Sequence, residues 1–527
     1  MKLVSAELMQ KIEKELVEKY DIPTLLLMEN AGRGVAAKAA QLVQEQSIEQ
    51  VYIICGVGNN GGDGLAVARH LRLTFPRLPI VVYLLGEITS SKPDAWANLQ
   101  IVEKLGNITV KQIILSEEMV LDPAGLVIDA IFGIGLSREV GGRYREVIER
   151  INSSPRQLVL SIDIPSGLDA TTGQVLGCAV KADFTVTLGL AKRGLFVYPG
   201  RDFAGKISVA SIGIPLIVRD QPGRSWLIEP ELIKKLLPLR GTHTHKISAG
   251  VVGVISGSSA LLGAGMLVAL GAYKSGAGMV VWPLPAEVAN LVKVRIPEVV
   301  SPLLPAVAPE WEYSSSHWEE LKQILTQRKC NSLAVGPGLG LKAETAALLR
   351  LLVEQPELKG VLDADGLNLV AQEREDWKDR LSGWVITPHP GEMARLLQWT
   401  PQKVNDNRVE AVFEAARFFG STTVLKGPGT LVATPEGELW VNPTGDPALA
   451  TAGSGDVLTG MIAAFMAQGL SPRDSALVGV FLHGLTGELT GKTVKDGVLA
   501  SELPEVITEA KRMLLNGKYR ISFMDGN

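Results

Sequence analysis

Short runs of consecutive apolar residues alternate with amphipathic stretches along most of this chain. In the first half, the apolar runs predict strands at 51–55, 79–85, 126–133, 158–167, 184–189 and 206–213. Amphipathic stretches between them predict helices at 65–73, 93–105 and 141–151, after two N-terminal helices that begin near Ser5 and Pro23. Apolar runs without polar alternation are typical of strands covered on both faces, so the pattern predicts a parallel α/β sheet.

The second half repeats the alternation with different loops. Strands are predicted at 251–255 and 278–282, and four more apolar strands run into polar loops within 333–340, 361–369, 385–393 and 423–430. A hairpin is predicted at 431–441. Helices are predicted at 230–239, 261–273, 318–327 and 457–470. The pattern breaks into short polar and proline-containing pieces at 214–226, which indicates a linker. We therefore predict two α/β domains, at 1–215 and 226–515.

Composition narrows the class of partner. The chain has 527 residues, 46% of them apolar, and a net charge of −4, so it has no basic surface for nucleic acid. Three widely spaced cysteines form no disulfide or metal pattern and indicate the cytoplasm. Residues 249–273 carry no charge, but glycines and serines divide them into a strand, a loop and a helix. We expect no membrane span.

Polar residues follow three predicted strands of the first half. The glycine-rich segment at 56–64 lies between a strand and a helix, a position in which backbone amides can meet a phosphate. Because ligands bind at the carboxyl ends of parallel strands, these polar side chains are expected in one crevice. Asp129 and Asp163 end apolar runs, so each needs a neutralising cation or acts as an acid or base. The polar residues are Asn59, Asn60, Asp63, Asp129, Asp163 and Ser166.

Polar loops also follow the strands of the second half. They are GPGLG at 336–340, DADG with Asp363 and Asp365, PHPGE with His389 and Glu392, and KGPGT from Lys426. The segment TAGSGDVLTG at 451–460 opens a helix with bare amides around Asp456. Bare amides, a lysine and one acid together indicate a nucleotide phosphate site in which the acid acts as a base. Each loop taken alone is also compatible with a structural turn.

The motifs of the first half resemble those of a known family. NNGGDG, VIDAIFGIGLSRE, IDIPSGLDATTG and AKRGL look like the NAD(P)H-hydrate epimerase domain, or YjeF N-terminal domain, over nearly all of the first 215 residues. The resemblance implies a Rossmann-like three-layer fold that interconverts the R and S hydrates of NAD(P)H. It implies a K⁺ site at Asn60, Asp129 and Ser166. It also implies hydrate contacts at Asn59, Asn60, Gly61, Gly62, Asp63, Gly133, Ile134, Gly135, Leu136, Ser137, Arg138, Glu139, Tyr144 and Asp163.

The chemistry of the hydrate agrees with an acid at the ring. The ring nitrogen can expel the neighbouring hydroxyl if an acid protonates it, and water can return to the other face. One carboxylate able to carry a proton is sufficient for both steps. We therefore predict Asp163 as the catalytic group of the first half.

The second half resembles the ribokinase-like superfamily and, within it, the NAD(P)H-hydrate dehydratase, or YjeF C-terminal, domain. GPGLG, DADGLN, TPHPGE, KGPGT and TAGSGDVLTG occur in that family's order over about residues 226–515. The resemblance implies an α/β/α fold that uses ADP or ATP with Mg²⁺. It implies Asp456 as the catalytic base. It also implies nucleotide contacts at Lys426, Gly427, Pro428, Gly429, Thr430 and Gly455, and hydrate contacts at Ala264, Gly338, His389 and Asp456.

The leading hypothesis is therefore a bifunctional repair enzyme for NAD(P)H hydrates that also binds an adenine nucleotide. One alternative makes the second half a vitamin or pyrimidine kinase, which would stop at the phosphate ester. Another makes the first half a nucleotide-sensing or partner-binding module without turnover. A helix rich in glycine and alanine at 261–272 could pack against a neighbouring chain, so a homo-oligomer is expected.

Overall fold

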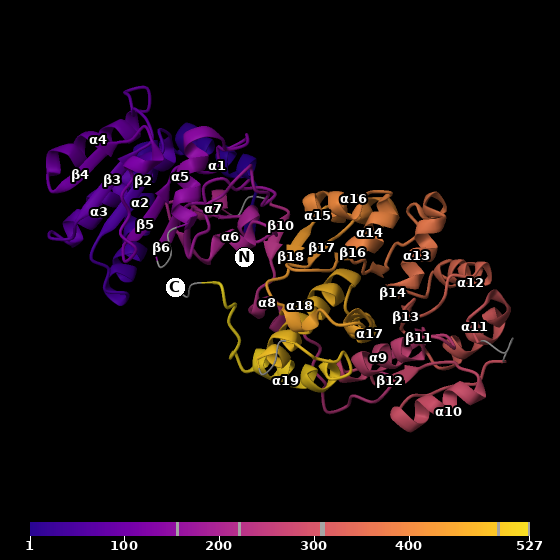
Figure 1. The fold of residues 1–527 in the computed structure, drawn as a ribbon. Helices are drawn as coiled ribbons and strands as arrows, with labels where there is room; N and C mark the ends of the chain where they lie inside the picture. The colour runs from indigo at the N-terminus through magenta and orange to yellow at the C-terminus, as the bar shows by residue number, and fades with distance from the viewer. Residues whose placement is uncertain (154–156, 220–222, 306–310, 493–495, 525–527) are drawn as a thin grey trace. The chain divides into compact units, whose positions relative to one another are not determined.

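The computed structural model describes residues 1–153, 157–219, 223–305, 311–492 and 496–524. They form two compact units, coloured along the chain in Figure 1. The N-terminal unit runs from Lys2 to Ser225 and includes the segment from Ser522. The C-terminal unit comprises Met1 and Trp226–Ile521. Residues 220–222 of the predicted linker lie outside the described residues.

A parallel sheet forms the centre of the N-terminal unit. Its strand order is β4 (Ile108–Gln112), β3 (Ile80–Leu84), β2 (Val51–Cys55), β5 (Leu126–Ala130), β6 (Leu158–Ile162), β7 (Phe184–Leu188) and β9 (Lys206–Ala210). Every neighbouring pair is parallel, so the predicted parallel sheet is confirmed. The sequence reading omitted β4, whose residues ITVKQ are mostly exposed and polar.

Both faces of this sheet are covered by helices. Val51, Ile53 and Cys55 of β2 belong to one apolar core, while Tyr52 and Ile54 belong to the other. The first core includes residues of α1 (Ala6–Tyr20), α2 (Thr24–Glu45), α3 (Asn59–Thr74) and α4 (Pro93–Leu105). The second includes residues of α5 (Gly142–Ser153). The alternation of side chains along each strand thus builds a three-layer α/β unit.

The glycine-rich segment differs from its prediction. Helix α3 begins at Asn59, so NNGGDG forms its first turns and not a loop that precedes a helix at 65. A Cβ on Gly61 would lie 1.9 Å from the Gly56 carbonyl oxygen, and one on Gly64 would lie 2.6 Å from the Ala130 Cβ. These glycines allow the helix to approach the sheet closely. Sequence alone does not distinguish that use of glycine from a turn.

The C-terminal unit contains a mixed sheet. Parallel strands occur in the order β12 (Met279–Val281), β11 (Val251–Ile255), β13 (Ser332–Val335), β14 (Gly360–Leu362), β15 (Val385–Ile386) and β16 (Thr422–Leu425). The predicted hairpin is confirmed as the antiparallel pair β17 (Leu431–Ala433) and β18 (Leu439–Val441). β11 has the predicted bounds, and β12 is one residue shorter at each end than predicted.

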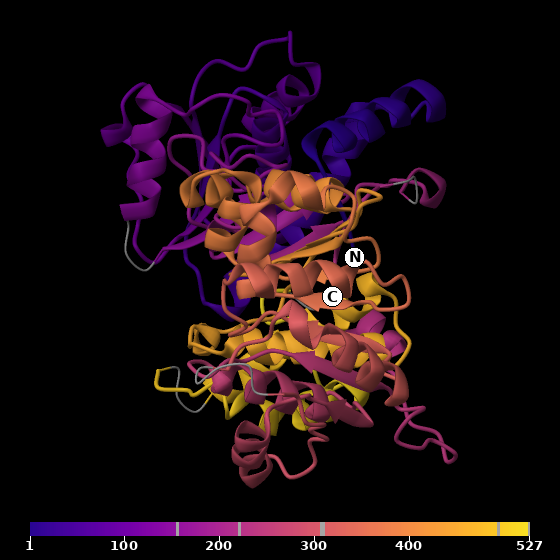
Figure 2. The same cartoon turned by 90° about the vertical axis from the view of Figure 1, so that its right-hand side faces the viewer.

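Helices cover both faces of this sheet as well (Figures 1 and 2). One face carries α9 (Leu262–Lys274), α17 (Ser454–Ala467), α18 (Pro472–Gly491) and α19 (Leu503–Leu515). The other carries α12 (Ala343–Val353), α13 (Asp365–Gln372), α14 (Pro390–Leu397) and α16 (Arg408–Phe419). The α/β prediction is therefore confirmed in both units.

The small residues of α9 serve packing within the chain. A Cβ on Gly271 would lie 2.4 Å from the Val457 carbonyl oxygen of α17. A Cβ on Gly460 of α17 would lie 2.0 Å from the Val268 carbonyl oxygen of α9. These glycines pack α9 closely against α17, which removes the reason given above for expecting a neighbouring chain at this helix. A homo-oligomer stays a prediction.

Several elements were not predicted. The stretch after Pro283, for which the sequence offered no motif, contains α10 (Ala286–Arg295), and its residues 306–310 lie outside the described residues. The short strands β1 (Lys2–Val4) and β8 (Ala191–Lys192) pair in parallel. No helix within the described ranges combines the length and hydropathy needed to cross a membrane.

The remaining α-helices and strands include two predicted helices, α8 (Pro230–Leu236) and α11 (Trp318–Gln327). The others are α6 (Arg201–Ala204), α7 (Leu216–Arg219), β10 (Ser225–Leu227) and α15 (Pro401–Asp406).

Candidate functional sites

A cavity of about 840 Å³ lies at the carboxyl ends of β2, β5 and β6 in the N-terminal unit. Most of the residues predicted to contact the hydrate line it. Gly61, Gly62 and Glu139 belong to that predicted set but are not among its lining residues. The predicted residues in the wall are Asn59, Asn60, Asp63, Gly133, Ile134, Gly135, Leu136, Ser137, Arg138, Tyr144 and Asp163.

Asp163 reaches this cavity from the end of β6. Its backbone has φ +68°, in the left-handed region that a non-glycine residue seldom adopts. Its Oδ1 accepts hydrogen bonds from the Leu188 amide at 3.0 Å and from Lys192 Nζ at 2.5 Å. The Thr187 hydroxyl donates to the same oxygen at 3.4 Å. The side chain is therefore fixed through one oxygen.

Lys192, in β8, is the cation beside Asp163. Its side chain is 1% exposed, and Nζ also donates to the Leu188 carbonyl oxygen at 2.5 Å. A buried lysine of this kind requires a partner charge, and Asp163 provides it. The sequence analysis quoted AKRGL only as part of a motif and gave Lys192 no role. An ion pair across 29 positions leaves no local sequence signal.

Three further acids, Asp63, Glu13 and Asp94, line the cavity. Asp63 of α3 is 8% exposed, and burial raises its pKa well above the usual range, with the negative charges of Asp163 and Glu13 acting in the same direction. Burial also raises the pKa of Glu13 in α1. Glu13 was not predicted. It is distant in sequence from every motif, and only the fold brings it to this wall.

Asp129 and Ser166 lie behind the cavity wall. Asp129 Oδ1 accepts from the Ser166 hydroxyl at 2.5 Å and from the Ile131 amide at 3.2 Å. Its Oδ2 accepts from the Ser161 hydroxyl at 2.9 Å and from the Ser166 amide at 2.8 Å. Asp129 is fully buried, and these partners are neutral. Burial accordingly raises its pKa.

Asn60 adds an unpaired amide to this region. Its Nδ2 is a buried side-chain atom for which the described residues provide no hydrogen-bond partner. A Cβ on Gly133 would lie 3.5 Å from Asn60 Oδ1, so the Gly133 loop passes close to the amide. Asn60, Asp129 and Ser166 thus offer oxygen atoms, the ligand type that hard cations prefer.

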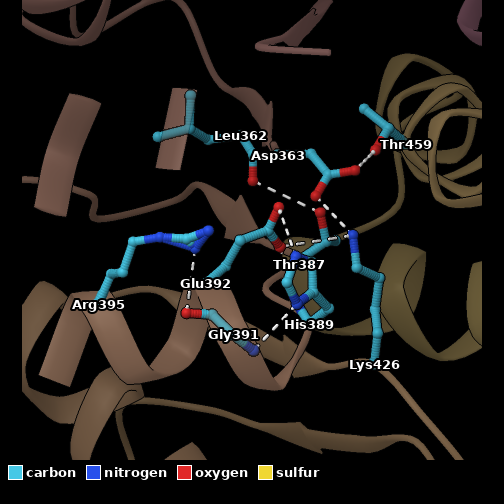
Figure 3. A network of polar contacts seen from close by, with 9 residues as sticks. All are labelled: Leu362, Asp363, Thr387, His389, Gly391, Glu392, Arg395, Lys426 and Thr459. Atoms are coloured by element: carbon cyan, nitrogen blue, oxygen red, sulfur yellow. Dashed lines mark hydrogen bonds and ion pairs between the residues drawn. The ribbon is translucent and has the colours of Figure 1, made fainter. Parts of the chain in front are cut away.

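The C-terminal unit gathers its charged residues around Lys426, which directly follows β16 (Figure 3). Lys426 Nζ lies 2.7 Å from Asp363 Oδ1 and 3.8 Å from Glu392 Oε2. The Thr459 hydroxyl donates to the other oxygen of Asp363 at 2.7 Å. Burial alone would lower the pKa of Lys426, but the charges of Asp363 and Glu392 outweigh it and raise the pKa. Lys426 therefore remains a cation.

His389 and Glu392 form the N-terminus of α14. The His389 amide donates to Glu392 Oε2 at 2.8 Å, and the Gly391 amide donates to His389 Nδ1 at 2.9 Å. This reciprocal arrangement satisfies free amides of the first turn. Burial and the charge of Lys426 lower the pKa of His389, whose ring is half exposed. Burial raises the pKa of Glu392 to about 7.

Asp456 lies in the first turn of α17, which Gly453 opens with φ +91°. Burial, and next the charge of Asp363, raise the pKa of Asp456 to about 7, while Lys426 opposes this shift. A Cβ on the neighbouring Gly455 would lie 3.2 Å from Lys426 Nζ. The lack of a side chain at Gly455 therefore leaves the space beside the Lys426 ammonium open. The structure thus brings together Asp456, Gly455 and Lys426.

Two buried residues that were not predicted support these loops. Arg408 of α16 donates to the carbonyl oxygens of Leu425, Lys426 and Pro428 at 3.4–3.5 Å. Burial lowers the pKa of its guanidinium to about 10. His483 of α18 contacts the Ser454 carbonyl oxygen at 3.0 Å. Both residues hold the backbone of a predicted motif from a different element.

The other predicted residues of this unit are Gly338, in the loop after β13, Ala264, in the first turn of α9, and those of the KGPGT loop. A Cβ on Gly338 would lie 3.2 Å from the Ala264 Cβ, so these two predicted hydrate contacts are neighbours. Gly338 has φ +64°, which a side chain would strain. The Thr430 hydroxyl donates to the Gly427 carbonyl oxygen at 2.9 Å and closes the KGPGT loop, with Pro428 and Gly429 between them.

Two family models match this chain. One, described as NAD(P)H-hydrate dehydratase, matches residues 252–509, and one described as YjeF-related protein N-terminus matches residues 24–194. The bifunctional NAD(P)H-hydrate repair enzyme Nnr of Moorella thermoacetica is 38% identical over 93% of this chain and 92% of its own length. Its namesake from Thermofilum pendens is 38% identical over 98% and 97%.

This chain belongs to the family of bifunctional NAD(P)H-hydrate repair enzymes. The resemblance of both halves, and the Rossmann-like and ribokinase-like folds that it implies, are confirmed. A separate vitamin or pyrimidine kinase is not favoured, because these relatives match across both units. A solved ADP/ATP-dependent NAD(P)H-hydrate dehydratase from Bacillus subtilis, co-crystallised with ATP/Mg²⁺, is 28% identical. It covers 55% of this chain and 98% of its own, with a TM-score of 0.46.

Proposed function

We propose that this chain repairs hydrated NAD(P)H with two activities, an epimerase at 1–215 and a dehydratase at 226–515. The observation that carries the proposal is the near full-length match to repair enzymes, joined to two separate sites that each contain a buried aspartate. The epimerase would make both hydrate forms available. The dehydratase would consume the S form. We expect the enzyme in the cytoplasm, as its cysteines suggest.

The N-terminal cavity supports the epimerase assignment. A hydrate bound there would place its hydroxyl-bearing carbon beside Asp163, the carboxylate that Lys192 and two neighbouring groups hold through Oδ1. A fixed carboxylate at the edge of this cavity can pass a proton to or from a bound hydroxyl or water. Asp163 is thus assigned as a catalytic residue.

A K⁺ ion at Asn60, Asp129 and Ser166 fits the residues present. The buried Asp129 carboxylate has only neutral hydrogen-bond partners among the described residues, unlike Asp163, which Lys192 neutralises. A monovalent cation would balance that charge, and the three side chains supply oxygen donors. When bound, K⁺ would supply a positive charge and help to fix the first turn of α3 at Asn60 and the loop at Phe132, whose amide donates to the Ser166 hydroxyl.

The C-terminal site supports the dehydratase assignment. When bound, a nucleotide triphosphate or diphosphate with Mg²⁺ supplies the phosphoryl group that converts the hydrate hydroxyl into a leaving group. Lys426 and the backbone amides of Gly427, Gly429 and Thr430 would hold the phosphates. Asp456, with a pKa raised by burial to about 7, would take the hydroxyl proton. Asp363 is committed to Lys426 and Thr459, so its part is to position the ammonium.

The test is an incubation of the full chain with a mixture of R and S hydrated NADH, with and without ATP or ADP. Complete, nucleotide-dependent recovery of the nicotinamide absorbance is expected, with R/S exchange faster than in a blank without protein. Recovery of the S fraction alone, with exchange at the blank rate, would remove the epimerase. Accumulation of a stable phosphate ester would replace the dehydratase by a kinase.

A further inference from the structure

Asp63 projects into the N-terminal cavity without a partner. Its side chain is nine-tenths buried, and no hydrogen bond or ion pair to it occurs within the described parts of the chain. An ionised carboxylate in such a place would be costly, because burial removes most of its hydration and no donor among the described residues compensates its charge. The site therefore favours the protonated carboxyl.

The charges around Asp63 act mainly in the same direction. Burial and then the negative charges of Asp163 and Glu13 hold its pKa well above the usual range. Lys192 opposes this shift, and Asp94 of α4 adds to it. Three carboxyls from α1, α3 and the end of β6 thus share one buried ammonium. A second carboxyl near the first proton carrier stays protonated when the first is paired.

Asp163 has the opposite character. It forms an ion pair with Lys192, and all hydrogen bonds that the described residues make to its carboxylate go to Oδ1. Oδ2 is left for a ligand. Asp63 begins from the helix after β2 and Asp163 from the end of β6, and β5 lies between these strands. The two carboxyls therefore approach one cavity from strands on either side of β5.

We propose that Asp63 is the general acid of hydrate epimerisation, acting opposite Asp163 as the base. This inference rests on the proposed epimerase function and adds a second catalytic residue to it. A single carboxylate, as the sequence analysis assumed, would have to serve both faces of the ring. Two carboxyls in different protonation states remove that requirement.

The proposed step is balanced. Asp63 donates its proton to the hydroxyl, the carbon–oxygen bond breaks as the ring nitrogen lone pair forms a carbon–nitrogen double bond, and water leaves. A water molecule then adds to the opposite face, and its proton passes to Asp163. The proton returns from Asp163 to Asp63 through water in the open cavity. The reverse reaction uses the same groups with their roles exchanged.

The test compares Asp63→Asn with the unmodified full chain. Asparagine has the same shape but cannot donate an acidic proton. The kcat of R/S exchange is expected to fall by about 10²–10⁴-fold with KM little changed. In the unmodified enzyme, exchange declines as pH rises through the pKa of Asp63, and Asp63→Asn loses that decline. Asp63→Glu, which keeps an acid, recovers part of the rate and the decline.

The stability of the Asp63→Asn variant is measured separately from its activity. The folded-state pKa of Asp63 is raised, so its protonation stabilises the fold at low pH and this contribution is lost as pH rises. Asp63→Asn is therefore expected to melt no lower than the parent at alkaline pH. Glu103→Gln, on the exposed face of α4, is the matched control and keeps full exchange. Parental kcat and pH dependence in a folded Asp63→Asn variant would overturn the inference alone. No exchange by the unmodified chain would overturn the epimerase proposal.

Discussion

Lys426 Nζ lies 2.7 Å from Asp363 Oδ1, and both residues directly follow strands of the same sheet. β14 and β16 lie on either side of β15, so the ion pair crosses the mouth of the sheet where its loops converge. Because Asp363 is 1% exposed, this ammonium is held in place before any anion reaches it. The lysine predicted to contact the nucleotide is thus positioned by Asp363, which the sequence placed only in the polar DADG loop.

Removing that acid should release Lys426. Asp363→Asn is expected to destabilise the C-terminal unit by about 3 kcal/mol, since it removes the nearer of the two acids that pair with this largely buried ammonium and leaves Glu392 at 3.8 Å. It should also abolish nucleotide-dependent dehydration. The measurements are thermal unfolding and the rate with S-hydrated NADH. Thr459→Val is the milder comparison, because it removes only one hydrogen bond to Asp363, about 1 kcal/mol. Equal losses in both variants would show that the ion pair has no special part.

Dehydration should depend on the ionisation of Asp456. A base must be deprotonated, and burial raises its pKa to about 7, so the rate is expected to rise with pH through that value. Asp456→Asn should remove the activity and the rise. A rate that is independent of pH from about 5.5 to about 8.5 would exclude Asp456 as the base.

The same shift predicts an effect on stability. An aspartate whose folded-state pKa is raised makes the fold less stable as pH rises from its unfolded value of 3.8 towards about 7. Near pH 8, Asp456→Asn should therefore have a higher melting temperature than the parent. The gain in the free energy of unfolding should be a few kcal/mol at most, since one pKa unit corresponds to about 1.4 kcal/mol. Differential scanning calorimetry at two pH values measures this. A lower melting temperature at both would contradict it.

Arg408 should control nucleotide affinity without touching the nucleotide. It donates to three carbonyl oxygens around the KGPGT loop from the helix behind it. Arg408→Met is expected to raise the KM for ATP or ADP about tenfold or more, with a smaller effect on kcat, because the loop amides lose their fixed positions. The matched control is Arg417→Met, on the exposed face of the same helix. An unchanged KM would show that the loop holds its shape alone.

Potassium should stabilise the N-terminal unit and promote R/S exchange. Replacing KCl by choline chloride at equal ionic strength is expected to lower the exchange rate and the melting temperature, because the buried Asp129 has only neutral partners among the described residues. Ser166→Ala should weaken the response to KCl. An identical exchange rate and melting temperature in both salts would contradict K⁺ binding at Asp129.

Much of this architecture could be predicted from the sequence. Continuous apolar runs placed β2 and β11, and an amphipathic stretch that begins at Pro93 placed α4, at their observed bounds, because covered strands and amphipathic helices leave local signals. The glycines after Cys55 gave a loop where the structure has a helix. Glycine occurs at these positions because α3 approaches the sheet closely, and that approach depends on tertiary packing.

The supporting residues of both sites could not be predicted in the same way. Lys192, Glu13 and Arg408 lie outside the strand-end loops, and each acts through a partner far along the chain. Strand-end position predicted which loops meet, since all parallel strands deliver their carboxyl ends to one edge. It did not predict which charges neutralise one another there. That pairing depends on distances that only the folded chain fixes.

The most direct test mixes two variants, each of which lacks one of the two activities. Asp163→Asn should recover only the S fraction of the hydrates beyond the spontaneous rate, and Asp456→Asn should exchange R and S without forming NADH. Combined in one tube with ATP or ADP, the two variants are expected to recover all of the NADH, because each supplies the site that the other lacks. Complete recovery by Asp163→Asn alone, or none from the mixture of folded variants, would contradict two separate aspartate-dependent sites.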